Sequence, residues 1–317
     1  MKSFLIAGWI FILLVFFPAG YLIREADAAG STRFGGKYNV PLPSEPQSLD
    51  PAYITGIYAT TVANNLFDGL VEFDENLNIL PAIAEIWKIS RDHRSYTFYL
   101  RKGVKFHNGR EVTAEDFVFS FRRILHPETR SPAASFFLAI KGAKSFLAGE
   151  TSELAGLQSL GPHTLKIDLE EPFSPFLSIL AMANAKVIPQ EAFQDDFSLH
   201  PVGTGPFKFQ SWEAGRAIIL TANSHYYAGR PNLDTLHFQI YPNQDWEKIF
   251  SDFERGFLEE SIIPSNQYEE IISNDQYTQR YQLVSQPALN LVYVGMNLQY
   301  PPLDDVRVRK AIAYAVD

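Results

Sequence analysis

Short stretches in which apolar and polar residues alternate recur along this 317-residue chain and limit its possible folds. In residues 95–100, Tyr96, Phe98 and Leu100 occupy every second position. Successive side chains of a strand point to opposite faces, so this spacing predicts a strand with one buried face. Further strands are expected near residues 37–41, 70–73, 86–89, 165–169, 207–212, 217–221 and 236–241.

Turn residues separate several of these strands. Gly215 divides two of them, residues 229–232 precede a third, and Asn108-Gly109 is a typical two-residue hairpin turn. Hairpins join antiparallel neighbours, whereas alternating strand–helix–strand units give parallel sheets. The sequence therefore predicts a mixed α+β organisation.

Amphipathic helices are predicted between the strands. Thr113 and Asp116 frame a capping box, and apolar residues follow at helical spacing over 117–125. Arg122 and Arg123 fall on the polar side of this helix, where we expect a solvated face. Other helices are expected near residues 60–67 and 246–253, the latter ending at Gly256.

The N-terminus is typical of an export signal. An uncharged apolar run extends from Phe4 to Ile23, and Ala26-Asp27-Ala28 fits the small-x-small cleavage pattern. The run approaches the ~20 residues that span a bilayer, so a retained anchor is the alternative. Pro18 and Gly20 interrupt it and favour cleavage. We expect residues 1–29 to be a signal peptide and the remainder to lie outside the cytoplasm.

Residues 289–317 are predicted to contain one strand and one helix. Residues 289–297 are expected to form an apolar strand, and Asp304-Asp305 can cap a helix that continues to the final residues. A helical pattern that runs to Asp317 without a stop signal predicts that the chain is part of a longer protein, with a frayed terminus as the alternative.

Composition and motifs argue against several classes of function. A net charge of −9 disfavours nucleic-acid binding, and the absence of cysteine excludes disulfides and thiolate chemistry. The seven histidines form no metal-binding motif, and neither a nucleophile elbow nor a phosphate-binding loop is present. We therefore expect no metal and no cofactor. A secreted hydrolase assembled from distant residues stays open, because catalytic triads are spatial.

Six groups of motifs, in order along the chain, resemble the family 5 extracellular solute-binding proteins, the peptide and nickel receptors of ABC importers. They are EPQSLDP at 45–51; LFDGL at 66–70 with LPAIAE at 80–85; LRKGVKFHNG at 100–109 with TAEDF at 113–117; GTGPF at 203–207; YAGRPNLD at 227–234; and GMN at 295–297 with PLDDVRVR at 302–309 and AIAYAVD at 311–317.

This resemblance implies an α+β or α/β fold in the form of a two-lobed periplasmic-binding-protein clamp, type II-like, with the second lobe truncated. Lobe I would comprise residues 30–285, and residues 286–317 would begin lobe II. The segment 257–260 departs from the family pattern, which leaves the ligand type open.

Ligand contacts are expected in the proline-rich loop, because a peptide in a cleft is bound largely through its backbone by extended segments. The candidates are Gln47, Ser48, Leu49, Thr55 and Tyr58. A purely structural role for this loop is the alternative. Gly203 and Gly205 are expected to be structural, at a close backbone approach, and Met296 and Asn297 to lie at the hinge between lobes.

By resemblance, the protein would be a non-enzymatic, monomeric substrate-binding component that captures oligopeptides or similar solutes and delivers them to an ABC transporter membrane permease. A peptide, nickel complex, haem, opine or oligosaccharide is an open possibility for the ligand. The alternatives are the secreted hydrolase and a membrane-anchored solute sensor.

Overall fold

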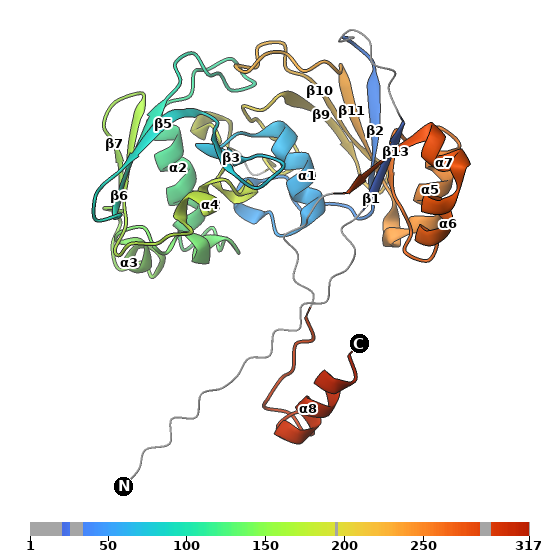
Figure 1. The fold of residues 1–317 in the computed structure, drawn as a ribbon. Coiled ribbons are helices and arrows are strands. Elements are labelled where there is room, and N and C mark those ends of the chain that lie inside the picture. Colours follow the sequence, from blue (N-terminus) through green and yellow to red (C-terminus); the bar gives the residue numbers. More distant parts are fainter. Residues whose placement is uncertain (1–20, 26–33, 194–195, 286–292, 317) are drawn as a thin grey trace.

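The computed structural model describes residues 21–25, 34–193, 196–285 and 293–316, and its strands form separate sheets (Figure 1). Three hydrophobic cores are built from residues before 293. The first core lies on a four-stranded antiparallel sheet of order β5-β6-β8-β7. Its strands are β5 (Ala84–Ile89), β6 (Ser95–Leu100), β7 (Leu157–Ser159) and β8 (Thr164–Asp168), with the hairpin β3 (Val71–Phe73) and β4 (Ile79–Pro81) nearby.

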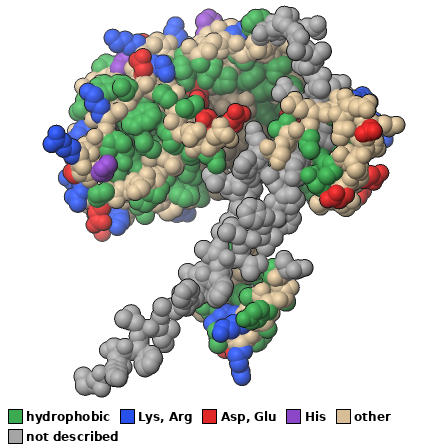
Figure 2. All heavy atoms as spheres, viewed as in Figure 1, with side chains coloured by type: hydrophobic (Ala, Val, Ile, Leu, Met, Phe, Trp, Pro, Cys, Tyr) green, Lys and Arg blue, Asp and Glu red, His purple; other side chains and the backbone are tan. Residues whose placement is uncertain are grey.

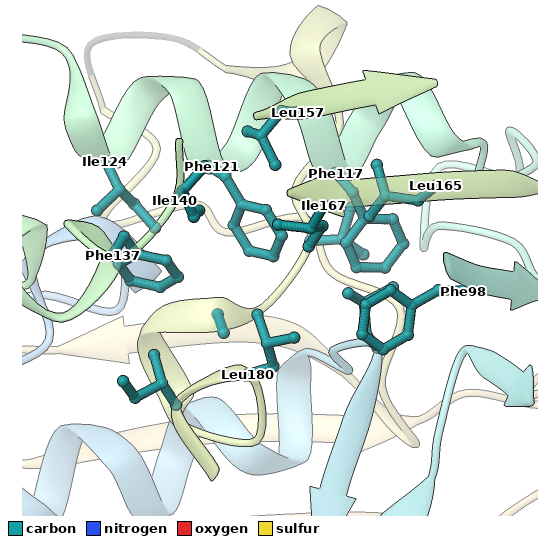
Figure 3. Packing of buried hydrophobic residues seen from close by; sticks show 14 of the residues in the cluster. Phe98, Phe117, Phe121, Ile124, Phe137, Ile140, Leu157, Leu165, Ile167 and Leu180 are labelled. Atoms are coloured by element: carbon teal, nitrogen blue, oxygen red, sulfur yellow. The ribbon is translucent and has the colours of Figure 1, made fainter. Parts of the chain in front are cut away.

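Helix α2 (Ala114–Leu125) covers this sheet because its apolar residues share one face. Phe117 and Phe121 point toward Phe98 and Ile167 of the sheet (Figure 3). The Asp116 carboxylate accepts the Thr113 N–H at 2.8 Å, so the predicted capping box is confirmed. Two short helices, α3 (Ala143–Leu147) and α4 (Phe176–Leu180), complete this core.

The second core lies between α1 (Ile57–Leu66) and the sheet β2-β11-β10-β9. Strands β9, β10 and β11 form the antiparallel meander that the turn residues predict, and β2 then pairs in parallel with β11. No local pattern indicates this last pairing, which places Lys37 beside Thr235. The bounds are Lys37–Leu42 for β2, Phe207–Glu213 for β9, Ala217–Ala222 for β10 and Thr235–Ile240 for β11.

The third core is smaller and is rich in aromatic residues from α5, α6 and α7. Gly256, with φ of 77°, ends α5 as predicted. The adjoining sheet has the order β12-β1-β13, and β1 lies within the range predicted as the signal peptide. The bounds are Tyr21–Glu25 for β1, Glu260–Ile262 for β12, Tyr281–Ser285 for β13, Trp246–Glu254 for α5, Tyr268–Ser273 for α6 and Asp275–Arg280 for α7.

Two expectations near the turns and the C-terminus need correction. Asn108-Gly109 makes a turn, but only the single bridge between Lys105 and Glu111 flanks it, rather than two strands. Of the strand predicted at 289–297, residues 289–292 lie outside the described residues, and 293–297 form no strand.

Helix α8 (Val306–Tyr314) is capped by Asp305, as predicted, but it ends at Tyr314 and does not continue through residues 315 and 316. It lies apart from the three cores (Figure 1). None of its residues is buried, and Figure 2 shows its basic side chains on the surface. Within the described part of the chain, no helix is long and apolar enough to cross a membrane.

A close backbone approach places residues 203–205 against the end of α1. A Cβ atom at Gly203 would lie 1.9 Å from the Leu66 carbonyl oxygen, and one at Gly205 would lie 2.6 Å from the Leu66 carbonyl carbon. The Gly205 N–H donates to that carbonyl oxygen at 2.9 Å. Only glycine allows this approach, and a structural role for both residues stays a prediction that the close distances support.

His107 holds the same glycine segment as a neutral ring. Its Nδ1 accepts the Gly203 N–H at 3.2 Å, so the proton lies on Nε2, which donates to the Gly205 carbonyl at 3.1 Å. Burial lowers the pKa of His107 to about 4, and nearby Lys208 acts in the same direction.

Replacing Gly203 by alanine should destabilise the fold by about 1–3 kcal/mol or more, because the methyl group has no free space beside Leu66. Gly56→Ala is the control, since a methyl group there would have nothing within 4 Å and the φ of Gly56 is negative. Urea unfolding would measure both variants. Equal stability of the two would contradict the close approach.

The pKa of His107 predicts a loss of stability in acid. As the pH falls from 6.5 toward 4, the unfolded chain protonates this histidine and the folded chain does not, so the free energy of unfolding falls by about 3 kcal/mol. His107→Gln can keep both hydrogen bonds without titrating, so its stability should fall less between pH 7 and 4.5. Urea unfolding at both pH values tests this, with exposed His200→Gln as the control. Parallel losses in the wild type and His107→Gln would refute it.

Candidate functional site

A cavity of about 150 Å³ lies between the proline-rich loop and the start of α1. Four of the five predicted ligand residues, Gln47, Ser48, Thr55 and Tyr58, line it together. Residues from two neighbouring segments therefore meet at one place. The complete lining is Ser44, Glu45, Pro46, Gln47, Ser48, Tyr53, Thr55, Gly56, Tyr58 and Ala59.

Leu49 does not belong to this cavity. Its side chain is 0% exposed and packs in the second hydrophobic core, with Leu42 and Leu66 among the other members. The expectation that Leu49 faces ligand is therefore wrong for its side chain. In an extended loop adjacent side chains point in different directions, and here the apolar one turns inward.

A buried ion pair fixes the end of the loop. The Asp50 side chain is 4% exposed and that of Arg123 is 8% exposed, and the Arg123 guanidinium donates to both carboxylate oxygens. The Asp50 Oδ1 atom also accepts the Ala52 N–H at 3.0 Å. Arg123 thus does not belong to the solvated face expected for it. It lies over the Phe193 ring, 4.1 Å from its centroid.

Hydrogen bonds to the backbone hold the segment between the loop and α1. The buried Asn184 amide donates to the Pro51 and Ile54 carbonyls at 2.7 and 3.0 Å. The Ser131 hydroxyl donates to the Ala52 carbonyl at 2.5 Å. Sequence reasoning missed these anchors and Arg123, because they come from segments far away in the chain and carry no local motif.

Glu45 joins the loop to the turn between β9 and β10. Its Oε1 atom accepts the Trp212 indole N–H at 2.8 Å and the Gly215 N–H at 3.0 Å. The loop is thus held at both ends, by Glu45 at one and Asp50 at the other.

Between the loop and α1 the backbone is extended and open. Ile54 has φ and ψ of −66° and 122°, and Gly56 has −131° and 159°. Within the described residues, the structure gives no hydrogen-bond acceptor to the N–H groups of Gly56 and Ile57. The Ile57 side chain is 62% exposed, and partial burial raises the pKa of Tyr58, which keeps its hydroxyl protonated.

The other predicted residues lie elsewhere. Gly203 and Gly205 contact Leu66 and do not line the cavity. Met296 and Asn297 lie in the irregular segment between β13 and α8, and a hinge there stays a prediction.

A second groove and a serine–histidine pair among the described residues are weaker candidates for a binding or catalytic site. A groove of about 490 Å³ follows α2 and contains none of the predicted ligand residues. Ser224 Oγ lies 3.1 Å from His225 Nδ1, but the pair is exposed and does not line the cavity. Among the described residues, His225 has no carboxylate partner. No cluster of three metal-binding side chains occurs in the part of the chain that the structure describes.

Known proteins are similar to this chain in sequence and in fold. The dipeptide-binding protein of Escherichia coli is 31% identical over 290 residues, which are 86% of this chain and 52% of the relative. The periplasmic oligopeptide-binding protein OppA of Salmonella typhimurium is 30% identical over 95% of this chain and 54% of its own length. The chain thus spans about half the length of the curated relatives it matches.

A solved structure of the oligopeptide-binding protein AppA from Bacillus subtilis, in complex with a nonapeptide, superposes with a TM-score of 0.77 at 26% identity. The alignment covers 90% of this chain and 55% of that one. The family model for bacterial extracellular solute-binding proteins, family 5, matches residues 78–317. The chain therefore belongs to the family 5 bacterial extracellular solute-binding proteins.

Proposed function

We propose that this protein is the exported substrate-binding component of an ABC importer, which captures oligopeptides and delivers them to a membrane permease. The observation that carries the proposal is the extended backbone of Ile54 and Gly56 beside the cavity, together with the open N–H groups of Gly56 and Ile57. Such backbone can accept a peptide as an added strand. The names of the relatives, which refer to dipeptides and oligopeptides, support the same ligand class.

The described residues would supply one side of the binding site. The N–H groups of Gly56 and Ile57 are available as donors to a peptide carbonyl, and Tyr58 and Thr55 can contact the adjoining peptide groups. Backbone pairing favours any peptide over one sequence. Side-chain preference would come from the small cavity and from the opposite lobe.

The proposal includes the domain assignment. Residues 1–29 would be a signal peptide, 30–285 lobe I and 286–317 the start of lobe II, with Met296 and Asn297 at the hinge. Ligand would stabilise a closed arrangement of the lobes by population shift. The protein would act outside the cytoplasm, as a monomer and without catalysis.

Peptides should raise the unfolding temperature of the protein expressed from its complete reading frame and freed of carried ligand. A ligand at about 100 times its Kd adds about 2.7 kcal/mol of stability. Thermal unfolding against pools of di- to pentapeptides measures this, with pools of free amino acids as the control. Mass spectrometry should recover the peptides intact. Cleaved products would favour the hydrolase, and no shift with any pool would reject peptide capture.

Arg123→Lys should weaken peptide binding by about tenfold and lower stability by about 1–3 kcal/mol. Lysine keeps the charge but cannot form the bidentate pair of hydrogen bonds to both carboxylate oxygens of Asp50, so the loop would lose its fixed position. Arg122→Lys, on the exposed neighbour, is the matched control. Isothermal titration and urea unfolding give the two readouts. If binding is unchanged in Arg123→Lys, the loop does not contribute to capture.

A further inference from the structure

The charge in the cavity beside the proline-rich loop is unbalanced. Of the ten residues that line it, Glu45 alone carries a charge, and the others are neutral. A carboxylate in a partly enclosed site is stabilised by a positive partner. Within the lining no such partner exists.

The geometry of Glu45 leaves one oxygen available. Both protein donors, the Trp212 indole N–H and the Gly215 N–H, bind Oε1. Among the described residues, the structure gives Oε2 no donor. The carboxylate is therefore held in a fixed orientation through one oxygen, while the other keeps its capacity to accept hydrogen bonds.

The size of the cavity limits what can enter. A volume of about 150 Å³ is below the ~300–1,000 Å³ of a pocket that encloses a whole small ligand. It suits one end group, such as an ammonium or guanidinium on a short stem. The Tyr53 and Tyr58 rings beside it can contact both the stem and the cation.

We propose that Glu45 binds a cationic group of the ligand, an ammonium or a guanidinium, through Oε2. This inference rests on the proposed function and adds a preference for ligands that carry a positive group at this position. Glu45 would thus serve both as a structural link to the β9–β10 turn and as a ligand contact. The amino terminus of a peptide and a basic side chain offer the same chemistry.

Glu45→Gln separates the two roles. The glutamine oxygen can still accept the Trp212 and Gly215 N–H groups, so the variant removes the charge and keeps the link. Glu213→Gln is the control, because Glu213 is exposed on the same strand as Trp212, pairs with Arg216 and does not line the cavity. Unfolding temperatures without ligand should agree for the wild type and both variants.

The experiment measures the Kd of a peptide found in the pool screen and of three matched forms by titration calorimetry. One form has each Lys replaced by norleucine, one has each Arg replaced by citrulline, and one has an acetylated N-terminus. At least one change should weaken binding to the wild type and to Glu213→Gln by about tenfold or more, because a charge-assisted hydrogen bond is lost. The same change should have almost no effect in Glu45→Gln. The form that responds identifies the source of the cation.

The outcomes distinguish this inference from the proposed function. If peptides bind but Glu45→Gln shows the same losses as the wild type, the role of Glu45 in ligand binding is overturned and peptide capture stands. If no peptide binds the wild type, peptide capture is rejected, and the inference that depends on it falls as well.

Discussion

The buried pair of Asp50 and Arg123 is the interaction on which the site depends, because it joins a loop of the second core to a helix of the first. Removing two charges from water is costly, and attraction offsets that cost only when the geometry is good and the remaining groups are satisfied. Here the guanidinium binds both carboxylate oxygens, and the Ala52 N–H adds a further donor. Loss of one partner from such a pair typically costs about 3–5 kcal/mol, since an unpaired charge remains buried.

The Asp50–Arg123 pair also helps to fix the proline-rich loop that borders the cavity. The proline-rich loop leaves β2 and cannot form a regular ladder, so its position must come from side chains. Asp50, Asn184 and Ser131 fix its far end, and Glu45 fixes its near end. The backbone after the loop is therefore held in an extended form while its outward N–H groups stay open.

Sequence reasoning predicted those parts of the fold that local patterns determine. The strands of the β9–β11 meander and the capping box of α2 follow from alternation, turn residues and end signals, which act over a few positions. The parallel pairing of β2 with β11 has no local signal, because it brings together segments that are far apart in the chain, with Lys37 beside Thr235. The turn at Asn108-Gly109 shows the reverse case, in which a strong local signal gives a turn without flanking strands.

The grouping of four candidate residues around one cavity also follows from a local property of the sequence. A loop with several prolines indicates exposed backbone, and the four residues that line the cavity follow from that property. The inward turn of Leu49, the burial of Arg123 and the role of Asn184 depend on which distant surface packs against the loop.

Ligand preference in this fold can arise from two different kinds of contact. In the proposed function, the open N–H groups of Gly56 and Ile57 would offer the same donors to every peptide, so they would contribute affinity without distinguishing side chains. A small cavity with one fixed carboxylate would discriminate by charge, because a neutral end group would leave Oε2 without a partner and a negative one would be repelled. If the cavity takes one end group, as proposed, the rest of a peptide would be held by other surfaces. Specificity would then be divided between Glu45 and the residues that close over the peptide from the opposite side.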